Sequence, residues 1–471
     1  MITSSHSYCQ PRWLLRLCSV LVIATSHALA QEQVPSTLGL RGAVELALRQ
    51  HPSVRESQAR AEAAGEGRTA ARLAYLPHLD LLWQQNRATR ANLFGMMLPQ
   101  GSVPGISGPV LDDDELSPSS VWGSAGGLLM TWEIADFGQR AAGVALASAG
   151  VTAAIARGEL TELDIAAGAA DTFVVALASD ERVRAAMANA ERVEVFRESV
   201  AILVENQLRP GADLARADAE LAAARIQVIQ AEQAAELGRV ALAEAIGIEG
   251  AVPQLDPGRL LDLAPPPAGT MPPPEQHPFA RAQEAAIEVV RARETLAGKS
   301  YLPRVNLQTT VFARGSGATL EGTNPDGNGL LPQVSNWAAG LSVTFPLMDV
   351  FSAKTRQRLE GANARAEEAR YDETIQRLRA EEASAQALVR AAEQIAVHTP
   401  VQLRAAQLAE LQATGRYNAG LGTIVEVADA QRVLAQAEAD QALAELGTWR
   451  ARLAEAHAAG DLTEFLNLVS P

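Results

Sequence analysis

The stretch GQRAAGVALASAGVTAAIARGELTELDIAAGAADTFVVALASDERVRAAMANAERVEVFRESVAILVENQL, residues 138–208, predicts a single very long α-helix. It contains no proline and is dense in Ala, Glu, Arg, Leu and Val, which favour helix. At a rise of 1.5 Å per residue, such a helix would be about 100 Å long. The apolar residues Val193, Phe196, Val200 and Leu203 recur at spacings of three and four. We therefore expect one stripe of this rod to pack against other helices.

The chain is an internal duplication, and its second half contains an equivalent rod at residues 351–416, which includes Pro400. His51-Pro52 and Tyr75-Leu76-Pro77 each recur 226 positions later. Asp136 recurs 213 positions later, and Asp213 has an acidic counterpart at the same offset. Two matches at each offset make chance a poor explanation.

The duplication divides the mature chain into two repeats, residues 31–262 and 279–471, joined by a proline-rich linker at 263–278. Each repeat is predicted to contain an opening helix, a β-hairpin, a long helix and a half-length helix. The opening and half-length helices together are about as long as the rod, so we expect them to lie end to end beside it. The hairpin, long helix and half-length helix are expected at 78–134, 138–208 and 213–246, and again at 304–347, 351–416 and 423–458.

The half-length helix of the first repeat has a regular heptad pattern. Leu214, Leu221, Val228, Ala235 and Leu242 are seven residues apart, and small residues such as Ala217 and Gly238 occupy the second core position. A sustained heptad indicates coiled-coil packing, and small core residues allow a close approach of the helices.

Two segments of the second repeat, 304–314 and 337–345, alternate apolar and polar residues with a period of two, which indicates strands with one apolar face. The first repeat has weaker equivalents around Leu79, Leu81 and Trp83 and in the Gly-rich segment 121–134. The fold class is therefore α+β, mainly α, with four strands in each chain. In an exported protein such strands are candidates for a transmembrane barrel, but four are too few to close one without further chains. The alternative is a half-buried sheet in a soluble oligomer.

If the strands span a membrane, their alternation predicts which side chains face lipid. Asn306 and Gln308 should then face the lumen. The lipid-facing set is expected to be Val305, Leu307, Val311, Leu341 and Val343.

Residues 1–30 have the features of a secretory signal peptide cleaved before Gln31: a basic flank, a short apolar run and an Ala-Leu-Ala end. The apolar run is far shorter than the ~20 residues of a membrane-spanning helix. Both cysteines of the chain, Cys9 and Cys18, lie in this segment, and Arg16 before Cys18 makes a poor lipidation signal. We expect an exported, cysteine-free and non-lipidated protein.

The composition argues against several classes of function. A net charge of −15 argues against nucleic acid or anionic lipid as the main partner. The seven histidines show no i,i+4 pair and no HExxH motif, and the sequence has no Walker loop, G-x-S-x-G or dinucleotide fingerprint. His51 and His277 both precede proline, which suggests a repeated role at helix starts. We therefore expect no enzyme activity, no cofactor and no metal site.

The order of these elements, with the motifs HPSV…LPHLDL and YNAGLGTIVEVADAQ, resembles the TolC-type outer-membrane efflux proteins. The resemblance covers residues 38–460. It implies a homotrimer in which three chains form a twelve-stranded barrel in the outer membrane. Their helices would form a hollow α-barrel through the periplasm, and the partners would be a periplasmic adaptor protein and an inner-membrane transporter.

The same resemblance places a periplasmic entrance at the far end of the rods. It puts Glu426 and Asp429 at positions whose acidic side chains ring the pore, Asp213 at the matching first-repeat position, and Tyr417 at a tyrosine that bonds the gate. A family member carries a basic residue where this chain has Gly422, so a gate bond through that residue is not expected here. A solvated helix face is the alternative for Glu426 and Asp429.

Three functions fit the sequence. The first is the exit duct of an efflux pump, and the second is the outer-membrane duct of a type I protein-secretion system. The third is a periplasmic coiled-coil adaptor or structural protein without a membrane barrel. The alternating strands argue against the third function, because an adaptor has no need of them.

Overall fold

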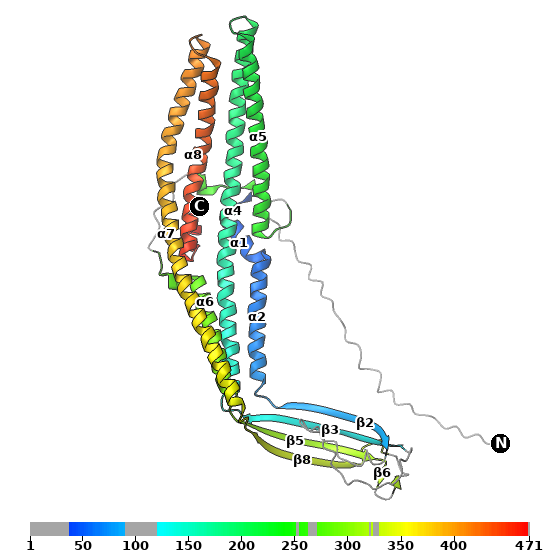
Figure 1. Cartoon of the computed structure of the whole chain (residues 1–471). Helices are drawn as coiled ribbons and strands as arrows, with labels where there is room; N and C mark the ends of the chain where they lie inside the picture. Colours follow the sequence, from blue (N-terminus) through cyan, green and yellow to red (C-terminus); the bar gives the residue numbers. More distant parts are fainter. Residues whose placement is uncertain are drawn as a thin grey trace, which may run out of the picture.

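The computed structural model describes residues 37–89, 120–250, 254–261, 271–319, 322–323 and 329–469. The described chain is a long helical rod with a β-sheet at one end, set at an angle to the rod (Figure 1). The expected signal peptide at 1–30 and the acidic loop residues Asp112, Asp113, Asp114 and Glu115 lie outside the described residues.

Two long helices form the rod: α4, Gln139–Glu205, has 67 residues, and α7, Asp349–Asn418, has 70. Helix α7 runs through Pro400 without ending, although proline removes a backbone donor. By length and composition alone, α4 is the one helix of the described chain that could cross a membrane. Its contacts with helices on several sides along its length give it a place in the rod instead.

Two shorter helices lie end to end along each long helix, as the lengths in the sequence suggested (Figure 1). Helices α2, Pro52–Leu73, and α5, Gly211–Ile246, pack on α4. Helices α6, Pro278–Lys299, and α8, Ile424–Ala459, pack on α7 and also contact α4.

The core of α5 follows its heptad pattern. Ala217, Leu221, Ala224, Ala235 and Leu242 are buried. A Cβ atom at Gly238 would lie 3.4 Å from Cα of Ala176, so the small residue lets α5 approach α4 closely. This is the packing that small core positions allow in coiled coils.

In each end-to-end pair of short helices, a histidine begins the helix nearer the sheet (Figure 1). His51 Nδ1 accepts a hydrogen bond from Ser53 N at 3.2 Å at the start of α2, and His277 Nδ1 accepts one from Phe279 N at 3.1 Å at the start of α6. Each of these histidines lies beside a glycine in the left-handed conformation that ends the neighbouring helix. Gly247, after α5, lies beside His51, and Gly460, after α8, lies beside His277. The expected helix-start role of both histidines therefore matches their position in the structure.

The widest part of the molecule surrounds these junctions. Helix α1, Leu40–Gln50, and helix α9, Thr463–Val469, pack there against α4 and α8. Strands β1, Thr37–Leu38, and β4, Gln254–Leu255, pair in parallel beside them, with the short 3₁₀ helices η1, Gly258–Leu261, and η2, Pro274–Gln276. The largest apolar core of the described chain lies here, around Phe173, Trp449 and Phe465.

The sheet has four antiparallel strands in the order β2-β3-β5-β8. They are β2, His78–Thr89; β3, Ser120–Ala135; β5, Arg304–Ser316; and β8, Val334–Thr344. A small pair, β6, Ala318–Thr319, and β7, Gly322–Thr323, lies at the far end. One hairpin comes from each repeat, and β2 and β8 are the two outer strands.

The register gathers large apolar residues from all four strands on one face, because directly paired residues of antiparallel strands share a face. One row across the sheet is Leu81, Leu128, Val311 and Trp337. The adjacent row on the opposite face contains Asp80, Leu129, Thr310 and Ala338. Gly126 is needed on the apolar face, because a Cβ there would lie 2.7 Å from the ring of Trp83.

Where the first hairpin meets the rod, Arg140 joins three segments. Its Nε lies 3.1 Å from Asp136 Oδ2 after β3, and its Nη1 donates to Ala74 O after α2 at 3.3 Å. The guanidinium also lies 4.7 Å from the ring centre of Tyr75. This clamp fixes the sheet to the start of α4.

Candidate functional site

At the end of the rod opposite the sheet, two turns connect consecutive helices, one between α4 and α5 and one between α7 and α8. Helix α4 ends in a turn in which Leu208 N donates to Leu203 O at 2.9 Å, with Gln207 at a φ of 59°. Helix α7 ends in the same way: Leu421 N donates to Arg416 O at 2.9 Å, with Gly420 at a φ of +78°. Both turns use the left-handed residue that closes many helices.

Tyr417 links the two turns. Its hydroxyl donates a hydrogen bond to Asp213 Oδ2 at 2.9 Å, and its ring lies edge-on to Phe196, with 5.5 Å between ring centres. The side chain is fully buried among residues of α4, α5 and α8, including Val200, Ala217 and Val427. The structure therefore brings together Tyr417 and Asp213, which are far apart in the sequence.

Arg209 covers the other side of the tyrosine. Its guanidinium lies 4.1 Å from the Tyr417 ring centre, and Nη2 donates to the Tyr417 carbonyl. Burial, followed by the hydrogen bond to Asp213 and its charge, raises the pKa of Tyr417 to about 12, against the opposing effect of Arg209. The phenol is therefore a protonated donor at neutral pH.

Glu426 lies in the first turn of α8, where Thr423 caps the helix. Thr423 Oγ1 accepts from Glu426 N at 3.4 Å and donates to the Glu426 carboxylate at 3.3 Å, so the hydroxyl caps the helix and also holds the Glu426 side chain. Arg416 Nε lies 3.9 Å from Glu426 Oε2, and both side chains are exposed. Gly422 lies against this pair, since a Cβ there would be 3.3 Å from both Arg416 Cβ and Glu426 Oε2.

Asp429 is one turn further along α8 and is also exposed. Its Oδ1 lies 3.4 Å from Arg432 Nη1, and Arg432 Nη2 lies 3.9 Å from Glu220 of α5. The structure thus places Glu426 and Asp429 next to each other on one exposed helix face. It gives each of them an arginine neighbour, whereas Asp213 is half-buried and bonded to Tyr417.

The sequence reasoning missed four residues of this site: Phe196, Arg209, Arg416 and Arg432. Phe196 was recognised only as part of an apolar stripe. A signal for Arg209 was available, because it directly precedes the Pro210-Gly211 turn that faces the second turn. Arg432 is three residues after Asp429, a spacing at which opposite charges meet on a helix.

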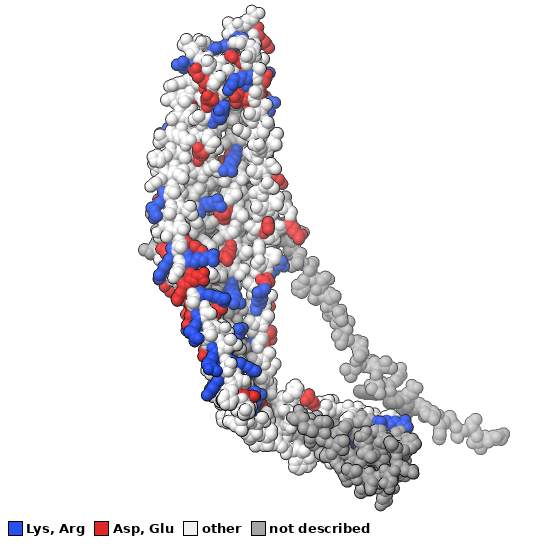
Figure 2. Space-filling model, viewed as in Figure 1, with Lys and Arg blue, Asp and Glu red and all other residues white. Residues whose placement is uncertain are grey.

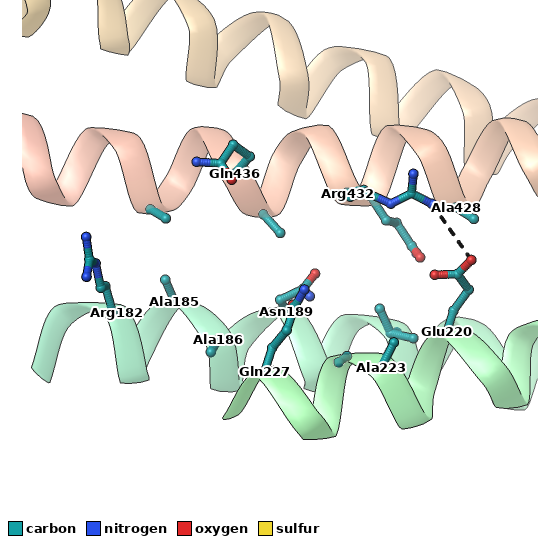
Figure 3. A pocket seen from close by; sticks show the side chains of 15 residues that line it. Arg182, Ala185, Ala186, Asn189, Glu220, Ala223, Gln227, Ala428, Arg432 and Gln436 are labelled. Atoms are coloured by element: carbon teal, nitrogen blue, oxygen red, sulfur yellow. Dashed lines mark ion pairs between the residues drawn. The ribbon is translucent and has the colours of Figure 1, made fainter. Parts of the chain in front are cut away.

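A cavity of about 270 Å³ lies below the turns, between α4, α5 and α8 (Figure 3). Alanines and polar residues line it in equal number, and the polar side chains include Arg182, Asn189, Gln227 and Gln436. The Oδ1 atom of Asn189 is buried there without a hydrogen-bond partner. The helices therefore pack less tightly just below the turns than within them.

At the other end of the molecule, the five expected lipid-facing residues share one face of the sheet. Val305 pairs with Val343 and Leu307 with Leu341, while Val311 lies in the same face between Leu128 and Trp337. Val311, Leu341 and Val343 are each about two-thirds exposed in the single chain (66%, 65% and 66%). This apolar face has no covering element in the described part of the chain.

The match to a known protein family covers most of the chain. The sequence model of the family described as "Outer membrane efflux protein" matches residues 43–248 and 275–460. A search of curated protein sequences finds no match.

Several solved structures share the fold. The outer-membrane channel OprN is 23% identical with a TM-score of 0.69 and 89% of each chain covered. The Campylobacter jejuni CmeC outer membrane channel is 16% identical with a TM-score of 0.71, covering 89% of this chain and 85% of that chain. The open state of the Neisseria gonorrhoeae MtrE outer membrane channel is 21% identical with a TM-score of 0.67, covering 90% and 89%. At these identities the likeness establishes the architecture of long helices and a terminal sheet.

Proposed function

The chain belongs to the outer membrane efflux protein family, and from this premise we propose that it is the exit duct of a tripartite efflux pump. The duct receives small molecules or ions from an inner-membrane transporter and a periplasmic adaptor and releases them outside the cell. Transport energy comes from the transporter, and the duct supplies a gated path.

The observation that carries the proposal is the four-stranded sheet with one apolar face at the end of the rod. Its two outer strands, β2 and β8, are each paired on one side only, so their outer edges have no strand partner in the described chain. A small closed barrel needs about eight strands, so one chain cannot form it. A homotrimer pairs β8 of each copy with β2 of the next and closes twelve strands. Val305, Leu307, Val311, Leu341 and Val343 then face outer-membrane lipid.

The two turns at the opposite end form the periplasmic entrance of this duct. The Tyr417–Asp213 hydrogen bond holds the α7–α8 pair against the α4–α5 pair, which corresponds to a closed gate. Glu426 and Asp429 project from α8 beside it, and threefold symmetry would surround the mouth with their carboxylates. Arg416 and Arg432 partly offset this negative charge.

The second candidate is the duct of a type I secretion system, which has the same family architecture but passes proteins. The role of a periplasmic adaptor is less well supported, because an adaptor does not need a sheet with an uncovered apolar face.

Two measurements test the proposal. The purified protein should migrate as a heat-modifiable trimer and form channels in planar bilayers, and a stable monomer with full strand content would refute the barrel. A deletion strain should accumulate fluorescent efflux substrates to a higher level than its parent, with an unchanged set of secreted proteins. Loss of a protein from the medium at normal dye accumulation would favour secretion instead.

A further inference from the structure

A strip of basic side chains follows the sheet at the start of α7. Lys354, Arg358 and Arg365 are all exposed. Their spacings of four and seven residues place them on one side of the helix. We call these three residues the basic strip. Figure 2 shows Lys and Arg side chains along the part of the rod that approaches the sheet.

The basic strip differs from the arginines further along the same helix. Arg370 is paired with Glu367 and Arg377 with Glu381. In the described chain, no carboxylate lies within ion-pair distance of Lys354, Arg358 or Arg365, and Arg358 only donates to the Thr355 hydroxyl at 3.4 Å. The strip therefore keeps its positive charge available to an external anion.

The residues just before the strip are large, apolar and exposed. Phe345 is 54% exposed, Leu347 68%, Met348 78% and Phe351 69%. Phe345 continues the alternation of Leu341 and Val343, and so belongs to the apolar face of the sheet. Phe351 precedes Lys354 by three residues, so it lies on the same side of α7 as the basic strip.

The first repeat has no such strip. The offset of 213 aligns Lys354, Arg358 and Arg365 with Ala141, Ala145 and Thr152 of α4. The equivalent helix start is therefore uncharged at the same three positions. The two junctions also differ in backbone conformation, since Phe137 and Gly138 before α4 have positive φ values whereas Met348 before α7 does not. The cations are thus a feature of the second junction alone.

We propose that the basic strip binds anionic phospholipid headgroups of the periplasmic leaflet of the outer membrane. This inference rests on the proposed function, because it requires the sheet to lie in that membrane. The apolar residues 345–351 lie at the edge of the hydrocarbon, and the cations follow in the headgroup layer. Aromatic and apolar anchors with flanking Lys and Arg are typical of membrane interfaces.

The distances along the helix fit this assignment. Lys354 and Arg358 lie about 8 and 14 Å beyond the start of α7 at 1.5 Å per residue. The polar layer on each side of a bilayer is about 5–8 Å thick, and long basic side chains extend several ångströms toward it. Arg365 lies about two turns further along the helix and acts through its field, which extends over a Debye length of about 10 Å. A strip facing a water-filled lumen would leave Phe351 exposed to water on the same side.

The test uses the full-length protein reconstituted in phosphatidylcholine vesicles with spin-labelled phosphatidylglycerol or phosphatidylcholine. The measurement is the fraction of each labelled lipid that is immobilised at the protein surface. Wild type should prefer phosphatidylglycerol by about threefold, since basic residues near the membrane surface attract anionic headgroups. The variant Lys354→Gln/Arg358→Gln/Arg365→Gln should lose most of this preference, and 1 M salt should abolish it in wild type.

The control variant is Arg157→Gln/Arg182→Gln/Arg390→Gln, which removes three exposed arginines elsewhere on the rod. It has the same net charge as the test variant and should keep the wild-type preference. An equal loss in both variants, or no preference in wild type, would overturn the inference. Heat-modifiable migration is measured in the same samples. Its absence in wild type would refute the proposed function itself. Inserted trimers that show no lipid preference would refute only the lipid site.

Discussion

The hydroxyl of Tyr417 donates a hydrogen bond to the carboxylate of Asp213, 2.9 Å away, between helix pairs that belong to different repeats. The bond lies at the end of the rod, where few other contacts join α7 to α5. Its removal should therefore weaken the link between the two pairs without disturbing the core around Phe173.

The first prediction concerns this bond. Tyr417→Phe keeps the ring against Phe196 but removes the donor, so the closed entrance loses a charge-assisted hydrogen bond of about 1.5–3 kcal/mol. We expect higher single-channel conductance and more frequent opening in planar bilayers. Tyr371→Phe on the same helix is the control, because no hydrogen bond of its hydroxyl is present in the described structure. Equal conductance in the wild type and Tyr417→Phe would contradict the gate assignment.

The second prediction concerns selectivity. Glu426→Gln with Asp429→Asn should lower cation selectivity and weaken block by multivalent cations, because clustered carboxylates attract cations at a narrow mouth. Trimer stability should change little, since a Gln side chain at position 426 can still accept the hydrogen bond of the Thr423 hydroxyl and the backbone cap is unchanged. The opposite pair, Arg416→Gln with Arg432→Gln, should raise cation selectivity. If reversal potentials stay the same in both double variants, these side chains belong to an ordinary solvated face.

The third prediction concerns the lipid-facing side of the sheet. Val311→Arg lies in the middle of β5 and should destabilise the inserted protein by about 2–4 kcal/mol. Leu307→Arg should cost less, because Leu307 is nearer the end of the strand and the cost falls toward the interface. Gln308→Arg on the opposite face should be mild. Urea unfolding in vesicles measures the three, and equal tolerance at positions 308 and 311 would rule out the assigned faces.

The fourth prediction concerns pH and His277. The pKa of His277 is lowered, mainly by burial and to a smaller extent by the charge of His457. The hydrogen bond to the His457 carbonyl and the charges of Glu381 and Asp164 act in the opposite direction and do not cancel this lowering. The unfolded chain therefore takes up a proton first as the pH falls. The contribution to stability is complete above about pH 6.5 and is lost as the pH falls through the lower folded-state pKa.

His277→Asn tests this dependence, because Asn caps helices well and does not titrate. The thermal midpoint of wild type in detergent should fall more steeply between pH 7 and pH 5 than that of His277→Asn. His51→Asn, at the matching cap of α2, is the control and should keep the wild-type slope. Parallel curves for all three proteins would show that protonation of His277 does not weaken the junction.

Much of the architecture could be predicted from the sequence because it depends on local chemistry. The proline-free rods, the turns after Arg209 and Ala419, and the period of two in β5 each follow from residues close together in the chain. The duplication then assigned equivalent elements to both halves. The rod predicted at 351–416 includes Pro400, and α7 continues through this residue although proline by itself favours a helix break.

The candidate site was less predictable because its contacts join distant segments. Tyr417 and Asp213 were selected through a resemblance, but the positions of Arg209 and Phe196 around the tyrosine depend on how two helix pairs meet. Arg416 and Arg432 reduce the local negative charge of Glu426 and Asp429, because each carboxylate has a cation beside it. Their side-chain directions follow from tertiary packing, which a linear pattern does not specify.

The two outer strands of the sheet have a consequence for how the protein is made. A single copy carries unpaired backbone donors and acceptors along the outer edges of β2 and β8, and such edges pair readily with any available strand. In the proposed trimer each of these edges is covered by a neighbouring copy, so a copy that has not yet assembled is exposed to aggregation. Because the proposed assembly needs three copies, the yield of inserted protein should rise more steeply than in proportion to synthesis.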